Sequence, residues 1–220
     1  MSPLLSRRKA AAPEIRNAQE VLLAAALVLS YPDQDLLDQL DTIESALAAT
    51  PYEPLFAPVF DHLRRPPEAR PDEPSSVLAR CQLYHVAEFD LSRKHAMHLT
   101  YWTDGDTRRR GNVLAEIKQV YRDSGLLVDT GGELPDYLPM VLEFAATDPQ
   151  RGLELLERFR ASVELIRLGL AADNLPHAGV LEAVCDLLPG ESPQTRAEVQ
   201  ARFGQVQPVE LVGLSITTRS

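Results

Sequence analysis

The sequence is poor in cysteine and lacks the short motifs that mark several enzyme classes. Its 220 residues contain two cysteines, Cys81 and Cys185, which form no Cys-x-x-Cys pair. This pattern favours buried free thiols in a reducing compartment over a disulfide or a metal site. Neither Gly-x-Ser-x-Gly nor Gly-x-x-x-x-Gly-Lys occurs. The sequence therefore offers no nucleophile elbow and no phosphate-binding loop.

Positive charge is also scarce. The chain has 22 Lys and Arg residues against 32 Asp and Glu residues, so its formal net charge is -10. Such a chain repels the phosphates of nucleic acids and of anionic lipids, and it attracts basic partners. We therefore expect a basic or apolar partner and no nucleic acid.

A long hydrophobic run is missing as well. The apolar run at residues 21–29 is far shorter than the ~20 residues that a helix needs to cross a bilayer. Glu14 and Glu20 interrupt the approach to this run, and no small-residue cleavage pattern follows it before Tyr31-Pro32. We expect a cytoplasmic protein with neither a secretory signal nor direct membrane insertion.

Alternating β-type patterns do not occur before the C-terminal tail, and apolar residues recur at helical spacing instead. With 45% apolar residues, the chain can bury a sizeable core in one domain. We predict an all-α fold, a single-domain helical bundle of about eight to ten helices. The helical domain spans residues 16–205, with an exposed proline-rich loop at 64–75, a mobile N-terminal tail at 1–15 and a C-terminal tail at 206–220.

Capping residues predict where individual helices begin and end. Asn17 with Glu20 reads as a capping box, and Asp33 and Ser76 each precede a helical pattern. The other expected elements are a mostly helical stretch at 91–102, a helix from Val113 to Tyr121 ended by Gly125, one helix from Asp148-Pro149 through Leu170, one capped by Asn174 and continuing to Leu187, and a weak helix within 192–203.

Three consecutive arginines stand where a helix is expected to begin. The macrodipole disfavours cations at a helix N-terminus by roughly 0.3 to 1 kcal/mol each, so Arg108, Arg109 and Arg110 break a local rule. Asp104 and Asp106 lie just upstream and can offset the charge. We hypothesise that Arg108 and Arg110 pair with these aspartates or contact an acidic partner surface.

The turn Pro135-Asp136-Tyr137-Leu138-Pro139 separates two helical patterns, and the next helix is expected to begin close to Asp136 with Pro139 in its first turn. Two prolines stiffen this turn, so it can present its side chains at low entropic cost. A groove flanked by Glu133, Asp136 and Glu143 can receive a basic amphipathic helix, with Tyr101, Trp102 and Tyr137 as anchors. Purely structural roles stay open, since Asp136 also suits a helix start, Trp102 suits a core, and the arginines suit a solvated surface.

Histidines supply the best candidates for catalysis or metal binding. His85 and Glu88, like His95 and His98, are spaced so that both members of a pair share one helical face. A carboxylate-bridged metal bundle needs further glutamates on other helices, and Glu143 is the single additional candidate. The metal signal is therefore weak, although a His/carboxylate metalloenzyme remains an alternative.

Several segments together resemble a known family. They are Phe89-Asp90-Leu91, Leu99-Thr100-Tyr101, Gly105-Asp106-x-Arg108-x-Arg110-Gly111, Glu133-Leu134-Pro135-Asp136-Tyr137-Leu138-Pro139 and Leu142-Glu143-Phe144. The set is similar to the nitrate reductase delta subunit family, the molybdenum cofactor assembly chaperones of the TorD/DmsD/NarJ-like superfamily. It covers about a quarter of the chain, and one departure is Tyr137, where the superfamily often has histidine.

The resemblance implies a TorD-like helical chaperone that is not an enzyme and not part of the mature reductase. Such a protein binds the apo catalytic (alpha) subunit of nitrate reductase, including its N-terminal peptide, and prepares it for insertion of molybdenum-guanine dinucleotide. It holds no cofactor stably itself, admits cofactor-delivery proteins as further partners, and is a monomer or a weak homodimer. The alternative partner is an unrelated amphipathic segment bound by a helical adaptor.

The expected client-binding residues combine the groove, the turn and the arginine segment, and no catalytic or metal-binding residue is assigned. They are Tyr101, Trp102, Asp104, Asp106, Arg108, Arg110, Glu133, Pro135, Asp136, Tyr137, Leu138, Pro139 and Glu143.

Overall fold

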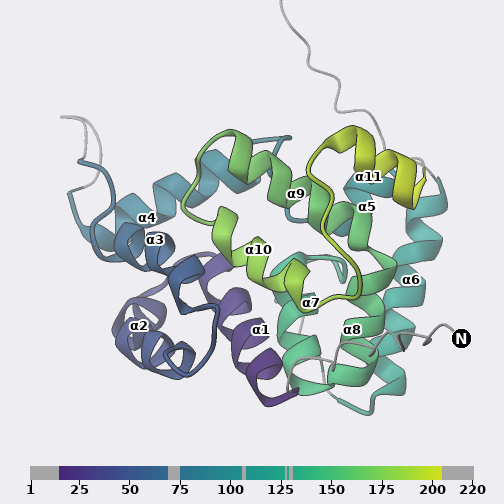
Figure 1. Cartoon of the computed structure of the whole chain (residues 1–220), viewed down its shortest axis with the longest axis horizontal. Coiled ribbons are helices and arrows are strands. Elements are labelled where there is room, and N and C mark those ends of the chain that lie inside the picture. Colours follow the sequence, from purple (N-terminus) through teal and green to yellow (C-terminus); the bar gives the residue numbers. More distant parts are fainter. Residues whose placement is uncertain (1–14, 69–74, 106–107, 127, 129–130, 205–220) are drawn as a thin grey trace, which may run out of the picture.

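The computed structural model describes residues 15–68, 75–105, 108–126, 128 and 131–204, and their regular structure is helical throughout (Figure 1). The only extended pairing in these ranges is one isolated antiparallel bridge between His98 and Tyr137. The predicted all-α class is therefore confirmed. The elements are α1 (Ile15–Leu29), α2 (Gln34–Leu47), α3 (Glu53–Arg64), α4 (Val77–His85), the π-helical turn η1 (Val86–Asp90), α5 (Leu99–Thr103), α6 (Arg108–Asp123), α7 (Leu138–Thr147), α8 (Pro149–Arg158), α9 (Arg160–Ala172), α10 (Ala178–Asp186) and α11 (Arg196–Phe203).

Helix α1 packs against α7, α2 and α10 and contributes much of the core. Val21, Leu22, Ala25 and Leu29 are completely buried on it. Small alanine side chains at this interface let the backbones of neighbouring helices approach closely. Asn17 lies inside α1, so the expected capping box at its start is wrong.

Local capping chemistry explains several other helix starts. A carboxylate oxygen of Asp33 accepts a hydrogen bond from the Leu36 N–H at 2.8 Å, and the Ser76 hydroxyl accepts one from Ala79 at 3.2 Å. The Asp148 carboxylate does the same for Arg151 at 3.2 Å. Each cap satisfies one of the backbone donors that a helix N-terminus leaves free, and each was expected from the sequence.

Residues 91–98 are not helical, which corrects the expectation of a helical stretch at 91–102. The indole N–H of Trp102 donates to the carbonyl of Ala96 at 2.9 Å, and the backbone at His98 pairs with that at Tyr137. These hydrogen bonds are not those of an α-helix, and regular helix begins only at Leu99 with α5. Tertiary pairing thus overrides a helical pattern of apolar residues.

The helix expected from Asp148-Pro149 through Leu170 is two helices, because the chain breaks at Phe159 between α8 and α9. Helix α8 packs on α7, whereas α9 packs on α5, α10 and α11 (Figure 1), so one straight helix cannot serve both sets of neighbours. Asn174 does not cap α10 as expected. It has a left-handed φ of 54° just after α9, and His177 is the residue before α10.

Candidate functional site

The segments before α5 and α7 meet side by side. The Leu99 N–H donates to the carbonyl of Asp136 at 3.0 Å, and the Leu138 N–H donates to that of Met97 at 2.8 Å. These two bonds flank the bridge between His98 and Tyr137. Two turns that are distant in sequence are therefore held in one register, and each leads directly into a helix.

The carboxylate of Asp136 lies at the centre of this junction and is completely buried. Its Oδ2 accepts hydrogen bonds from the Thr100 N–H at 2.9 Å and from the Thr100 hydroxyl at 2.5 Å. The guanidinium Nε of Arg110 in turn donates to the Thr100 hydroxyl oxygen at 3.0 Å. A chain of hydrogen bonds thus links α6, α5 and the turn before α7.

Asp136 therefore caps α5 and not α7, the helix that follows it in sequence. Thr100 is in the first turn of α5, so the carboxylate satisfies a free backbone donor of α5 across the junction. The residue before α7 is Tyr137, which makes no side-chain capping bond. The alternative role of Asp136 as a cap of α7 is therefore wrong, whereas the prediction that α7 begins close to Asp136 with Pro139 in its first turn is confirmed.

Several other expected site residues also lie in the interior. Trp102 is 1% exposed and Leu138 is fully buried, and Pro135 and Pro139 are buried as well. The Tyr121 hydroxyl donates to the Pro135 carbonyl at 2.8 Å, which holds the turn against α6. Burial, reinforced by the charge of Asp136, raises the pKa of Tyr121. These residues shape the junction rather than form its outer surface.

At the start of α6, one arginine forms an ion pair with an aspartate upstream. This arginine is Arg109, whose Nε lies 3.1 Å from Oδ1 of the buried Asp104. Arg108 is exposed and forms no ion pair with any residue in the described ranges, and Asp106 lies outside those ranges. One aspartate upstream thus offsets part of the positive charge at the helix start.

An acidic aromatic surface, which we define as Asp90, His98, Glu133 and Tyr137, lies on the outside of the same junction. The His98 and Tyr137 rings meet edge to face with their centroids 5.5 Å apart, and His98 Nε2 is 3.9 Å from a Glu133 oxygen. Burial, with the negative charges of Glu133 and Asp90, raises the pKa of the Tyr137 hydroxyl. Leu91 and Leu134 are exposed next to these residues in sequence.

Of the expected groove, Glu133 and Tyr137 belong to this surface, and Tyr101 is half-buried one residue before Trp102. Glu143 is exposed on α7, but no hydrogen bond or ion pair within the described residues joins it to Glu133. Sequence reasoning did not assign Thr100, His98 or Asp90 to the site. Thr100 and Asp90 lie in segments of the family-like pattern, and His98 was considered only as a possible metal ligand.

Of the four residues of the possible metal site, only Glu88 and His95 lie together. His85 contacts the rings of Tyr31 and Phe89, and His98 faces Glu133. His95 lies between Glu88, 3.4 Å from its Nδ1, and Asp173, 3.2 Å from its Nε2. Across the ranges given for the structure, no three His, Cys, Asp or Glu side chains are arranged to hold a metal ion.

Comparison with known proteins gives a consistent picture. Residues 35–182 match the family model described as "Nitrate reductase delta subunit". The chain is 38% identical over 163 residues to the nitrate reductase-like protein NarX of Mycobacterium tuberculosis. The aligned residues make up 73% of this chain and 23% of NarX. It is 34% identical over 102 residues to the probable nitrate reductase molybdenum cofactor assembly chaperone NarJ of Bacillus subtilis, which covers 46% of this chain and 55% of NarJ.

The fold is also similar to a solved structure. A putative redox enzyme maturation protein from Archaeoglobus fulgidus superposes with a TM-score of 0.55 at 18% identity, over 84% of this chain and 98% of that one. At this identity the likeness concerns the fold alone. Among the helices that the structure describes, none combines the length and the apolarity that a membrane span requires.

Proposed function

Because this chain belongs to the nitrate reductase delta subunit family, we propose that it is an assembly chaperone for a molybdenum-containing nitrate reductase and not an enzyme. The match over residues 35–182 carries this proposal, since it contains the whole junction of α5, α6 and α7. The matched part of the chain spans about half the length of NarJ and under a quarter of NarX. The activity and the partners of this chain are therefore proposals.

The proposed client is the apo catalytic subunit, whose N-terminal peptide binds while molybdenum-guanine dinucleotide is inserted. Two properties of the chain favour a cationic peptide. Its formal net charge is -10, and on the acidic aromatic surface the negative charges of Glu133 and Asp90 help to raise the pKa of the Tyr137 hydroxyl. Carboxylates steer a basic peptide to the surface, and aromatic rings bury its apolar side chains.

In this proposal Asp136 acts through the backbone and does not touch the peptide. Its buried carboxylate holds α5 against the turn before α7, and this register sets the spacing of His98 and Tyr137 on the outer surface. Asp136→Asn keeps an acceptor for the Thr100 N–H, so we expect it to change peptide affinity by less than about threefold. A loss of ~1.5 to 3 kcal/mol of affinity in a folded protein would instead indicate a direct charged contact.

Calorimetric titration with a synthetic N-terminal peptide of the catalytic subunit tests the proposed surface. We expect binding that weakens as salt is added and that carries a negative heat-capacity change. Glu133→Gln should reduce the affinity by about three- to tenfold at low salt, because it removes one steering charge. The matched control is Glu182→Gln on α10, an exposed glutamate outside the junction. Equal affinities for both variants would contradict the location, and no binding to the wild type would contradict the peptide-binding function.

A helical adaptor for an unrelated partner would share the same fold and acidity. The distinguishing observation is co-purification, in which the chain is expressed with the complete apo catalytic subunit and with an unrelated protein that carries a basic amphipathic N-terminus. A chaperone of this family should retain the catalytic subunit and release the other. Equal retention of both would favour the adaptor.

A further inference from the structure

Trp102 was expected to anchor a client, yet it is buried, and part of its cover is α11. The guanidinium carbon of Arg196, the first residue of α11, lies 5.6 Å from the centre of the Trp102 ring. The same side chain passes over α9 at Gly169, where an added Cβ would lie 3.6 Å from Arg196 Nη2. Helix α11 thus lies across α9 and α5, as Figure 1 shows at the upper right.

Helix α11 itself is attached by few side chains. Val199 is completely buried, whereas every other residue from Arg196 to Phe203 is exposed. Thr195 caps its start by accepting a hydrogen bond from the Glu198 N–H at 3.2 Å. An isolated helix of this length is marginal in water, so α11 depends on its docking contacts. Segments with so little buried apolar surface open at low free energy.

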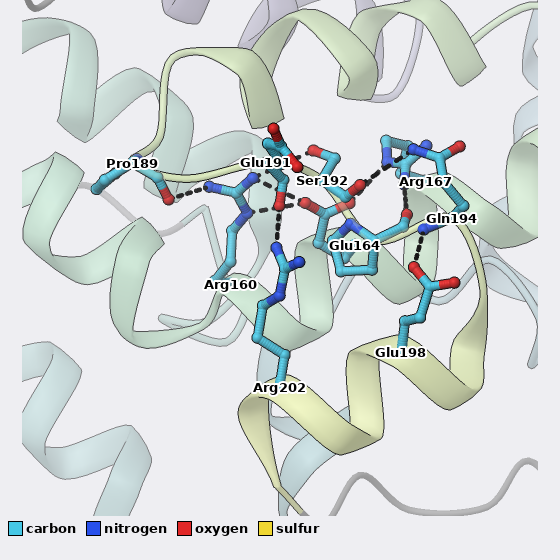
Figure 2. A network of polar contacts seen from close by, with 10 residues as sticks. Arg160, Glu164, Arg167, Pro189, Glu191, Ser192, Gln194, Glu198 and Arg202 are labelled. Atoms are coloured by element: carbon cyan, nitrogen blue, oxygen red, sulfur yellow. Dashed lines mark hydrogen bonds and ion pairs between the residues drawn. The ribbon is translucent and has the colours of Figure 1, made fainter. Parts of the chain in front are cut away.

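The strap that leads to α11, residues 189–193, is held much more firmly (Figure 2). Glu164 is fully buried between two arginines of α9, with 2.9 Å to Arg160 Nε and 2.7 Å to Arg167 Nε. Arg160 also donates to the Pro189 carbonyl and the Ser192 hydroxyl, and Arg167 donates to the Pro193 carbonyl. Arg202 of α11 reaches back to the Glu191 carbonyl, so the strap also keeps one contact with the helix.

We propose that the surface beneath α11 is a second client-binding face, and that α11 is a displaceable cover that occupies it in the chain alone. Its occupant is a helical segment with a cation over Trp102 and an apolar side chain three residues further on, as Arg196 and Val199 are now placed. Residues three apart share one helical face, so a basic amphipathic helix can copy both contacts. This inference rests on the proposed function.

The chain carries its own probe, because Trp102 is its single tryptophan. Displacement of α11 changes the surroundings of the indole, and therefore its fluorescence emission. The full-length protein is titrated with the synthetic N-terminal peptide of the catalytic subunit while the hydrogen exchange of α11 is followed by mass spectrometry. We expect a shift in Trp102 emission together with faster exchange in residues 196–203.

A variant that loosens the cover provides a second measurement. In the full chain, Val199→Asp places a negative charge in a buried apolar site and should release α11. The control, Gln200→Asp, introduces the same charge on the exposed side of the helix. Since competition by α11 is then removed, the client peptide should bind Val199→Asp at least about tenfold more tightly than the wild type or Gln200→Asp. Arg196→Gln, which keeps Val199 in place, should give a smaller change in the same direction.

A peptide with the sequence of residues 194–204 tests the surface without the client. It should restore wild-type Trp102 emission when added to Val199→Asp, and the same peptide with Asp in place of Val199 should not. The inference is overturned if the client peptide binds with unchanged exchange in α11 and with equal affinity for all four proteins, while the proposed function stands. It is also overturned if the peptide of residues 194–204 fails to change the emission of Val199→Asp. If the wild-type protein does not bind the client peptide at all, both the inference and the proposed function are contradicted.

Discussion

Asp136 and Glu164 are both fully buried carboxylates, but they are held by different kinds of partner. Asp136 accepts from the N–H and hydroxyl of Thr100 through one oxygen, and its Oδ1 has no hydrogen-bond partner in the part of the chain that is described. Glu164 is bonded by a guanidinium group at each of its oxygens. Asp136 therefore orients backbone segments, whereas Glu164 neutralises the two arginines that hold the strap before α11.

The two arrangements also assemble differently. Arg160, Glu164 and Arg167 lie on one face of α9 at helical spacings, so folding of that single helix brings them together. Asp136 and Thr100 are separated by 36 positions and meet only when the turns before α5 and α7 pair. One carboxylate thus depends on local structure, and the other depends on tertiary structure.

The largest expected effect comes from breaking the ion-paired cluster. Glu164→Ala leaves the buried Arg160 and the partly buried Arg167 without their counter-charge, and we expect the free energy of unfolding to fall by about 3 to 5 kcal/mol. Urea denaturation followed by circular dichroism measures this loss. The matched control, Glu182→Ala, removes an exposed glutamate of α10 and should change stability by about 0.5 kcal/mol or less. Similar values for the two variants would show that the buried cluster adds no net stability.

The corresponding change at Asp136 should be smaller. Asp136→Ala leaves the N–H and hydroxyl of Thr100 without their acceptor, which predicts a loss of about 2 to 3 kcal/mol. Asp136→Asn keeps one acceptor and should cost about 1 kcal/mol. The same denaturation experiment tests both variants. A loss for Asn as large as that for Ala would mean that the negative charge, and not hydrogen-bond acceptance, stabilises the junction.

Lowering the pH should affect the buried carboxylates and a cluster of histidines differently. In this cluster His62 and His177 lie against Tyr84, and Phe89 lies against both His177 and His85. Burial lowers the pKa of His62 and His85 and, aided by both of those histidines, lowers the pKa of His177 to about 3. The folded protein keeps these rings neutral, whereas the unfolded chain protonates them when the pH falls below their unfolded pKa of about 6.5. Their contribution to the free energy of unfolding is therefore present above pH ~6.5 and is lost as the pH falls.

For His177 alone we expect the free energy of unfolding to fall by about 2 kcal/mol between pH 7 and pH 5. Glu164 behaves differently. Burial alone raises its pKa, but hydrogen bonds from Arg167, Ser192 and Arg160 outweigh burial, and the net pKa lies below its usual value. Its contribution persists until the pH falls below the unfolded value of about 4.3. Denaturation at several pH values should show a shallower slope from pH 7 to pH 5 in His177→Gln, and an unchanged slope would assign the loss to other groups.

The smallest effect is expected at the start of α6. Arg109 is 83% exposed although its partner Asp104 is buried, so solvent screens the ion pair. We expect Arg109→Gln to lower the free energy of unfolding by about 0.5 kcal/mol or less. Thermal denaturation at low and high salt tests this, because any effect should shrink as salt is added. A loss that is large and independent of salt would place Arg109 among the structural contacts of the junction.

The sequence by itself determined the helical class, most of the helices and the caps at Asp33, Ser76 and Asp148. These features depend on residues three or four positions apart, which a sequence pattern contains. The family-like segments also identified the region in which the junction lies. Within that region the sequence could not separate residues of the surface from residues of the interior.

Only the tertiary structure decided which helix Asp136 caps, why residues 91–98 are not helical and what covers Trp102. Each depends on a partner far along the chain: Thr100 for Asp136, Tyr137 for His98, and Arg196 for Trp102. Helical periodicity encodes the face on which a side chain lies, but it does not encode the neighbour that will pack there. That choice follows from how all the helices bury their apolar faces together, which is a property of the folded chain as a whole.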